Sequence, residues 1–203
     1  MIGVVHYGLG NIAAFLSIYK RLNIAAAPVS TAEELAQADR IILPGVGSFD
    51  WAITRLEQAG LRPTLEALVQ SEKRPVLGVC VGMQMMAKSS EEGQLAGFGW
   101  IDATTKLMRG APGAKPLNLP HMGWNDVRVS STHPLMRGLG SPQFYFLHSY
   151  HVAPVEPDVS IAVAEYGGAF TAAVGAGNVM GTQFHPEKSH ESGIELLRNF
   201  AEL

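Results

Sequence analysis

The nine residues VLGVCVGMQ at positions 76–84 determine the fold prediction for this chain. They begin as a short, apolar, β-branched segment, which is typical of a buried strand that ends at Cys80. Glycines stand two residues before and two residues after this cysteine, where a tight strand-to-helix turn needs a backbone without a Cβ. The pattern is the thiol counterpart of the nucleophile elbow, a turn that presents a reactive side chain above the edge of a sheet.

An elbow at this position predicts a chemical role for Cys80. The helix that follows would place partial positive charge beside the sulfur and favour thiolate over thiol. The backbone N–H of Val81 would then help to hold a developing oxyanion. The alternative is that Cys80 is a small buried apolar residue, as many lone cysteines are, but the two flanking glycines favour the nucleophile.

The segment QFHPEKS at residues 183–189 supplies the base that a thiol nucleophile requires. His185 follows a predicted strand, and Glu187 lies two residues later, which is the same side of an extended backbone. Pro186 keeps the residue before it extended. Glu187 is therefore expected to orient the imidazole and to stabilise its protonated form, as the third member of a triad does. Alone, the segment could equally be a surface turn with a solvated ion pair.

A second glycine-containing turn, PGVGS at residues 44–48, follows the predicted strand 40–43. Its glycines allow close backbone approach and an inward N–H, which suits an oxyanion donor and a grip on substrate. The candidate residues are Gly45, Val46 and Gly47. Read alone, the segment is equally compatible with an ordinary strand-to-helix loop.

The rest of the first half alternates strands and helices. Strands are predicted over 2–6, 24–29, 40–43 and 75–79, and helices over 11–22, from Thr31, 50–59 and 63–71. The second half reads as short strands over 101–108, 126–129, 143–147, 160–165 and 178–184, with a Gly/Pro-rich loop over 110–120. A capping box from Ser192 to Glu195 predicts a last helix that ends near residue 200.

This order predicts an α/β fold: a mostly parallel central sheet flanked by helices, with an additional antiparallel portion in the second half. We expect a single domain over residues 1–203. Ligands of such sheets bind at the carboxyl ends of the strands, which is where both the elbow and the PGVGS turn fall.

Composition excludes several classes of protein. The 203 residues are 47% hydrophobic and 16% charged, with a net charge of −3, which argues against disorder and against a nucleic-acid or anionic-membrane surface. One cysteine excludes an internal disulfide framework. No apolar run is long enough for a membrane span, and the first residues lack the basic flank and apolar stretch that a signal peptide would show, so we expect none. We expect a cytoplasmic protein with no metal site and no cofactor.

Taken together, the elbow, the His-x-Glu segment and the PGVGS turn resemble the class I glutamine amidotransferase family, over essentially the whole chain. Five segments also resemble one branch of it, the glutaminase subunits of imidazole glycerol phosphate synthases. These segments are YGLGN at 7–11, LPGVGSF at 43–49, PHMGWN at 120–125, YFLHSY at 145–150 and HPEKS at 185–189.

The resemblance implies that Cys80, His185 and Glu187 hydrolyse glutamine to glutamate and ammonia. It also implies that Gln84, Ser149 and Tyr150 hold the substrate. The partner would be a (β/α)8-barrel cyclase subunit in a heterodimer, which receives the ammonia and makes imidazole glycerol phosphate and AICAR in histidine biosynthesis. Residues 44–47 would be a two-state element controlled by that partner. The family positions that line the interface match Asn11, Trp124, Tyr145, His148 and Lys188.

The chain departs from the family pattern at two positions: His6 stands where Asp is usual, and Val81 stands where Leu is usual. Three alternatives stay open. One is a related glutaminase that supplies ammonia for the amidination of a surface sugar. Another is a dinucleotide-binding module, because Gly8, Gly10 and Ala13 match its fingerprint, although no acidic residue ends the second predicted strand. The third is a catalytically idle scaffold, which nothing in the sequence supports.

Overall fold

The four apolar segments of the first half form neighbouring parallel strands, in the order β2-β1-β3-β4. In the computed structural model, which describes residues 1–110 and 116–203, their bounds are β1 (Ile2–Val5), β2 (Ala26–Val29), β3 (Arg40–Gly45) and β4 (Val76–Cys80). Strand β3 continues two residues beyond its predicted end, so Gly45 pairs with Cys80 across the sheet. The sequence therefore places all four strands correctly.

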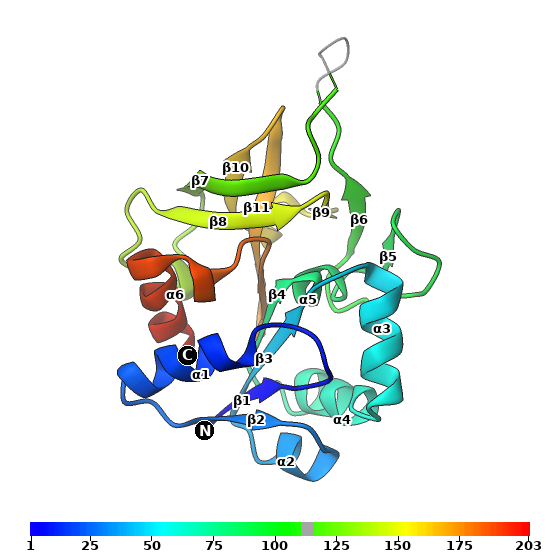
Figure 1. Cartoon of the computed structure of the whole chain (residues 1–203), viewed down its shortest axis with the longest axis vertical. Coiled ribbons are helices and arrows are strands. Elements are labelled where there is room, and N and C mark those ends of the chain that lie inside the picture. Colours follow the sequence, from blue (N-terminus) through cyan, green and yellow to red (C-terminus); the bar gives the residue numbers. More distant parts are fainter. Residues whose placement is uncertain (111–115) are drawn as a thin grey trace.

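The helices of this half also lie close to their predicted positions. They are α1 (Ile12–Arg21), α2 (Ala32–Ala36), α3 (Phe49–Gln58) and α4 (Arg62–Glu66), which continues as a π-helical segment, Ala67–Ser71. The Asn11 side chain accepts a hydrogen bond from the Ala14 amide, and Thr31 and Glu34 form the predicted capping box. Figure 1 shows α1 and the last helix, α6 (His190–Glu202), on one side of the strands, with α3 and α4 on the other.

The second half extends the same sheet with antiparallel strands. From β4 the order continues β12-β11-β10-β7-β8, with bounds β12 (Val179–Thr182), β11 (Ala169–Ala176), β10 (Ser160–Glu165), β7 (His121–Val129) and β8 (Gln143–His148). A separate sheet contains β5 (Ser89–Ser90), β6 (Ala103–Leu107) and β9 (Tyr150–Pro154). Short 3-10 turns cover Pro134–Met136, Pro157–Val159 and Pro186–Lys188. The predicted fold class is confirmed.

Strand β12 joins the two kinds of pairing. It runs parallel to β4, with Thr182 opposite Val79, and antiparallel to β11. The residues that follow β12 therefore emerge beside the elbow at the end of β4. This register brings together two segments that are about a hundred residues apart in the sequence.

Several predictions for the second half were wrong. β7 begins at His121, five residues before the predicted strand, and β9 and β11 were not predicted. The last helix begins at His190, so Ser192 and Glu195 lie inside it and do not cap it. In the predicted loop 110–120, residues 111–115 lie outside the described residues. Across the described residues, no helix is long and apolar enough to cross a membrane.

Candidate active site

Cys80 lies in a strained turn at the end of β4. Its backbone has φ of 56° and ψ of −113°, a conformation that is rare for a residue with a Cβ. A Cβ on Gly82 would lie 1.9 Å from the Leu43 carbonyl oxygen, so only glycine fits there. The elbow geometry that the sequence predicts is therefore present, and local backbone strain of this kind collects at functional sites.

The helix after the elbow is shorter than expected. α5 spans only Val81–Gln84, a single turn. Its dipole is correspondingly small, so the predicted stabilisation of the thiolate by a helix N-terminus is weak. Other groups around the sulfur must supply most of any such stabilisation.

His185 and Glu187 form a buried pair at the end of β12. The Nδ1 atom of His185 lies 2.9 Å from Oε1 of Glu187, and the two side chains are only 5% and 3% exposed. Burial lowers the pKa of His185, but its interactions with the side chains of Cys80 and Glu187 outweigh that effect and raise the pKa to about 10. The imidazole is therefore held in its protonated form at neutral pH.

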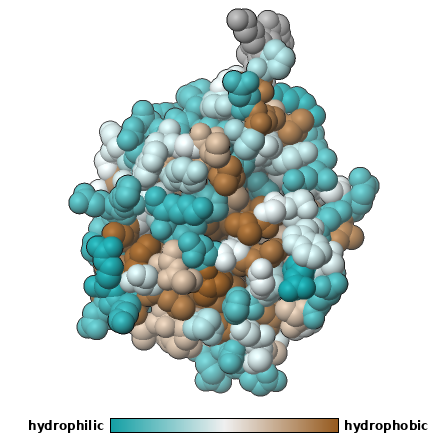
Figure 2. Space-filling view, viewed as in Figure 1, coloured by the Kyte–Doolittle hydropathy of each residue, from teal (hydrophilic) through white to brown (hydrophobic). Residues whose placement is uncertain are grey.

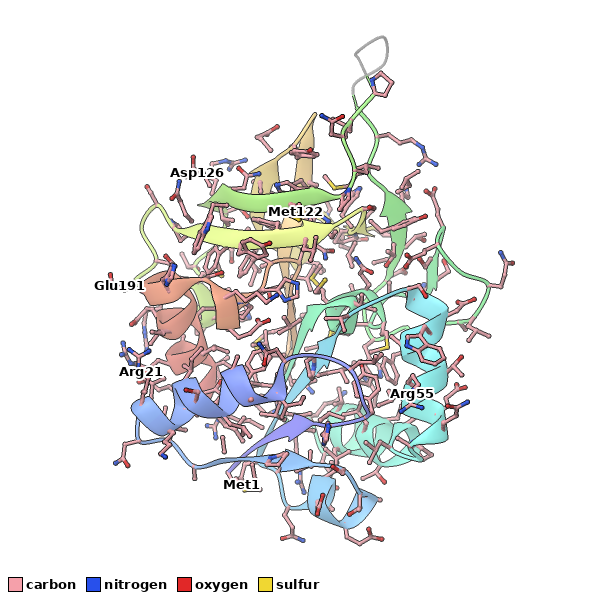
Figure 3. All side chains as sticks on the ribbon, in the orientation of Figure 1. Met1, Arg21, Arg55, Met122, Asp126 and Glu191 are labelled. Atoms are coloured by element: carbon pink, nitrogen blue, oxygen red, sulfur yellow. The ribbon has the colours of Figure 1, made fainter. Side chains whose placement is uncertain are left out.

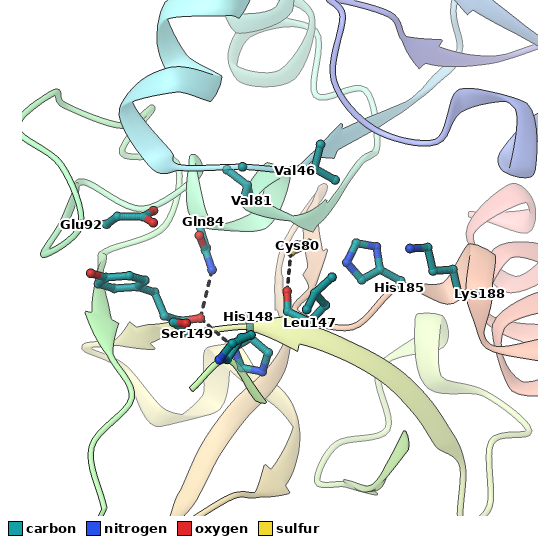
Figure 4. A pocket seen from close by; sticks show the side chains of 13 residues that line it. Val46, Cys80, Val81, Gln84, Glu92, Leu147, His148, Ser149, His185 and Lys188 are labelled. Atoms are coloured by element: carbon teal, nitrogen blue, oxygen red, sulfur yellow. Dashed lines mark hydrogen bonds between the residues drawn. The ribbon is translucent and has the colours of Figure 1, made fainter. Parts of the chain in front are cut away.

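The sulfur of Cys80 has two further neighbours. It donates a hydrogen bond to the Leu147 carbonyl at 3.8 Å and accepts one from Nε2 of Gln183 at 3.7 Å. Figure 4 shows the His185 ring beside Cys80. Because Nδ1 of His185 faces Glu187, its Nε2 is the nitrogen available to the thiol.

Cys80 and His185 line a pocket of about 300 Å³. It contains most of the residues proposed for catalysis and glutamine binding and two that were proposed for the partner interface. The lining residues are Val46, Gly47, Cys80, Val81, Gln84, Glu92, Pro120, Leu147, His148, Ser149, Tyr150, His185 and Lys188. Among the predicted substrate residues, only Gly45 is missing from this lining.

Gly45 has a structural role instead. It is buried at the end of β3, and a Cβ there would lie 2.5 Å from the backbone nitrogen of Gly82. Glycine at this position lets β3 approach the elbow closely. The preceding residue, Pro44, is also fixed in place, because the Tyr7 hydroxyl donates a 2.6 Å hydrogen bond to its carbonyl. Burial raises the pKa of Tyr7, so it stays a donor.

Gly10, in the first turn, also packs against Pro44. A Cβ on Gly10 would lie 2.6 Å from the Pro44 side chain. In a dinucleotide site such glycines clear space for a pyrophosphate, but here the space beside Gly10 is filled by Pro44. The structure therefore disfavours the dinucleotide alternative.

His148 is buried rather than exposed. Its Nδ1 lies 2.8 Å from the Tyr150 carbonyl, and its Nε2 lies 3.0 Å from Nδ1 of His121. Burial lowers the pKa of His148 to about 3, so the ring is neutral. In the isolated chain this residue supports the pocket wall and does not contribute to the surface.

The other residues proposed for the interface lie on the surface. Trp124 is 46% exposed, packs edge-on against Tyr145 and stacks on His190 with ring centroids 5.1 Å apart. The Lys188 ammonium lies 5.6 Å from the centre of the Tyr145 ring. Asn11 is exposed at the start of α1, where it caps the helix.

Two polar side chains of the site, Glu92 and Gln183, were missed from the sequence. Glu92 lines the pocket and accepts a hydrogen bond from the Phe49 amide at 2.8 Å, but nothing in its local sequence marks it. Gln183 is fully buried against the sulfur. It precedes His185 by two residues at the end of the predicted strand 178–184, so the alternation of side chains along that strand could have found it. Within the described ranges, no cluster of three metal-binding side chains occurs.

Comparisons with known proteins agree with this geometry. The family model "Glutamine amidotransferase class-I" matches residues 12–203. A protein of Bdellovibrio bacteriovorus named imidazole glycerol phosphate synthase subunit HisH is 53% identical over the full length of both chains. A protein with the same name from Leptospira interrogans is 49% identical, again over all of both chains.

A further relative from Pseudomonas aeruginosa, named imidazole glycerol phosphate synthase subunit HisH 2, is 44% identical over the full length of both chains. Among solved structures, a crystal structure of a glutamine amidotransferase superimposes with a TM-score of 0.76. It is 22% identical and covers 100% of this chain and 99% of the other. At that identity the superposition supports the fold alone.

Proposed function

The chain belongs to the class I glutamine amidotransferase family, and from this premise we propose that it is the glutamine-hydrolysing subunit of an imidazole glycerol phosphate synthase, acting in histidine biosynthesis. Three full-length relatives at 44–53% identity carry that subunit's name. The observation that carries the catalytic proposal is the convergence of Cys80 and the buried His185–Glu187 pair on one pocket.

In the proposed reaction, His185 already holds the proton that the Cys80 thiol gives up, and the thiolate attacks the carboxamide carbon of glutamine. The C–N bond breaks as His185 returns the proton to the departing nitrogen, and ammonia leaves. Water then attacks the γ-glutamyl thioester and gives its proton to His185. The thioester breaks down to glutamate and the Cys80 thiolate, which restores the starting state. Glu187 keeps the imidazole oriented and stabilises its charged form.

The oxyanion of both steps needs N–H donors near the sulfur. Val81 follows the nucleophile directly, and Val46 and Gly47 line the same pocket. Gly47 has φ of +89°, which allows the backbone to turn there. We assign Val81 and the Val46–Gly47 segment as donors, with residues 44–47 as the part whose setting a partner controls.

The α-amino group of glutamine is positively charged and requires an acceptor. Glu92 is the only carboxylate among the described residues that line the pocket, which it shares with Ser149 and Tyr150. Because Glu92 also caps α3, a Glu92→Gln variant keeps the cap but loses the charge. We expect about a tenfold or greater rise in KM for glutamine.

This role of Glu92 has a matched substrate control. Glutaramate, which is glutamine without its α-amino group, should be an equally poor substrate for the wild type and for the Glu92→Gln variant. If Glu92→Gln impairs the turnover of glutaramate as strongly as that of glutamine, Glu92 does not recognise the amino group.

The partner surface is proposed to surround the mouth of the pocket. Val46 and Leu147 line the pocket and are 40% and 38% exposed. Met122, labelled in Figure 3, is 66% exposed. It pairs with Leu147 on the adjacent strand. Trp124 and Tyr145 form the next pair but one in the same register. Figure 2 shows hydrophobic residues gathered across the middle of this face.

An apolar rim of this kind around a pocket that releases ammonia suits a (β/α)8-barrel cyclase. Free ammonia would be protonated and lost in bulk water, whereas a docked partner encloses it. The names of the relatives favour histidine synthesis as the destination over amidination of a sugar.

The test is a reconstitution. The chain is mixed with the barrel cyclase encoded with it and with the cyclase's nucleotide substrate, and glutamate and imidazole glycerol phosphate are measured together. We expect equimolar formation of the two products, and glutamine hydrolysis that rises when the partner is loaded. Glutamate formation without any imidazole product would contradict the histidine assignment and favour the sugar alternative.

A further inference from the structure

The sulfur of Cys80 has a neighbour that the proposed mechanism does not use. Gln183 is fully buried, directly follows β12, and places its side-chain Nε2 3.7 Å from Sγ. Its backbone is fixed by a 2.8 Å hydrogen bond from its amide to the Ala172 carbonyl on β11. The side chain therefore approaches the nucleophile from a rigid strand end.

The orientation of this amide follows from its neighbours. The Tyr150 carbonyl can only accept, so the Gln84 side-chain nitrogen, 3.0 Å away, must face it as a donor. The same nitrogen lies 3.1 Å from the Gln183 side chain, which must present its oxygen there. The NH2 group of Gln183 is then left to point at the sulfur.

The Tyr150 carbonyl is itself anchored from the other side. Nδ1 of His148 donates to it, because Asn125 donates to Nε2 of His121 and leaves Nδ1 of His121 as the donor to Nε2 of His148. Every donor in this series of hydrogen bonds has an acceptor, so the arrangement is self-consistent with both imidazole rings neutral. It extends from β7 to the nucleophile.

We propose that Gln183 is a further catalytic residue, which donates a hydrogen bond to the charged sulfur and is oriented for it by Gln84. A donor to the charged form favours that form. The Leu147 carbonyl acts in the opposite sense, since it accepts from the thiol. With the proton on His185, the sulfur has no proton to donate to the Leu147 carbonyl, and the hydrogen bond from Gln183 strengthens. The one-turn α5 helix contributes little here, so the donor from Gln183 adds to the stabilisation that the charged His185 ring gives the sulfur.

The contribution acts whenever the sulfur is charged: before attack on glutamine and again when the thioester breaks down. This inference rests on the proposed role of Cys80 as nucleophile. Its test, however, needs neither glutamine nor the partner, so the two can fail separately.

Cys80 is the only cysteine, so alkylation by iodoacetamide reports on it alone. The rate is measured from pH 5 to 10 for the wild type, Gln183→Met and Gln183→Glu. Met keeps nearly the size of Gln but removes the donor, and we expect the pH midpoint of alkylation to rise by about one unit. Glu adds a negative charge beside the sulfur and should raise the midpoint further. Gln58→Met, on the exposed end of α3, is the matched control and should leave the midpoint unchanged.

A second measurement separates this role from a merely structural one. For Gln183→Met, kcat/KM for glutamine should fall about tenfold at neutral pH and recover in part as the pH is raised, because the thiolate fraction recovers. If Gln183→Met unfolds the protein, Gln183→Glu, which preserves the shape of the side chain, decides the question. An unchanged alkylation midpoint in a folded Gln183 variant overturns the proposal.

Discussion

The active site combines residues from two regions of the molecule, and the positions of these residues are determined in different ways. The parallel region consists of β1 to β4, whose carboxyl ends meet at one edge of the sheet. It supplies Cys80 at the end of β4 and Gly45, which pairs with it, at the end of β3. The antiparallel region supplies His185, Glu187 and Tyr150, whose places depend on which distant strands pair. The nucleophile is therefore set by a local turn, whereas its base depends on long-range register. Strand β12, which pairs both ways, links the two.

The largest expected effect comes from the parallel region. Cys80→Ala removes the attacking atom, and glutamate formation in the reconstituted complex should fall by at least about 10³-fold. The variant should still bind glutamine, measured by calorimetry, because the rest of the pocket is intact. Undiminished turnover would show that the local turn is not the source of the nucleophile.

The matching change in the antiparallel region is Glu187→Gln. It keeps the size of the side chain and removes the charge behind His185, so kcat should fall about 10²-fold. Histidine NMR should show the His185 ring titrating at a lower pH than in the wild type. Equal titration in both proteins would mean that Glu187 does not stabilise the imidazolium.

The same pair predicts a pH dependence of stability. The pKa of His185 is about 10 in the folded chain against an ordinary value of 6.5, so the folded state binds the extra proton. This contribution is fully present below pH 6.5 and is lost as the pH rises through 10. Urea unfolding of the wild type should therefore lose more stability than that of Glu187→Gln between these limits.

A glycine comparison sharpens the contrast in backbone packing. Gly45→Ala would push a methyl group into the elbow backbone and should lower the free energy of unfolding by about 2 kcal/mol. Gly140→Ala, in the antiparallel region, has nothing within 4 Å of the new Cβ and serves as the control. Equal unfolding midpoints in urea for the two variants would contradict the claim that β3 needs a glycine at position 45 to pack against the elbow.

The smallest effect is expected at the rim of the pocket. Trp124→Ala removes a half-exposed aromatic side chain without touching the core, so it should weaken binding of the cyclase about tenfold and leave the melting temperature unchanged. Val155→Ala, on a more exposed apolar residue outside the proposed surface, is the control. Titration of the labelled cyclase measures the binding of each variant.

The sequence predicts the parallel region well because its signals are local. Apolar strands, the Thr31–Glu34 capping box and the flanking glycines of Cys80 act within a few residues. The same kind of signal failed for the second capping box. Ser189, which the sequence did not single out, precedes α6 and donates to the His185 carbonyl at 2.6 Å, so the helix starts where a tertiary contact fixes it.

The antiparallel strands were harder to predict because their pattern follows their surroundings. β7 exposes Met122 and Trp124 and buries His121, the reverse of the polarity expected for a free surface. β11 is rich in alanine and glycine, which favour strands weakly. The position of Glu92 depends on its contact with α3, which no local pattern encodes. Gln183, in contrast, could have been predicted, because it lies two residues before His185 at the end of a predicted strand, where alternate side chains share one side.

The central claim is that the sulfur of Cys80 and the imidazole of His185, one from each region, act as a single unit. The most direct measurement is the rate at which a glutamine-like diazoketone labels the chain, followed by intact-mass spectrometry in the wild type and in His185→Gln. We predict one label, on Cys80, that glutamine blocks and that forms at least about 10²-fold more slowly in the variant. Equal labelling rates in the two proteins would contradict the account.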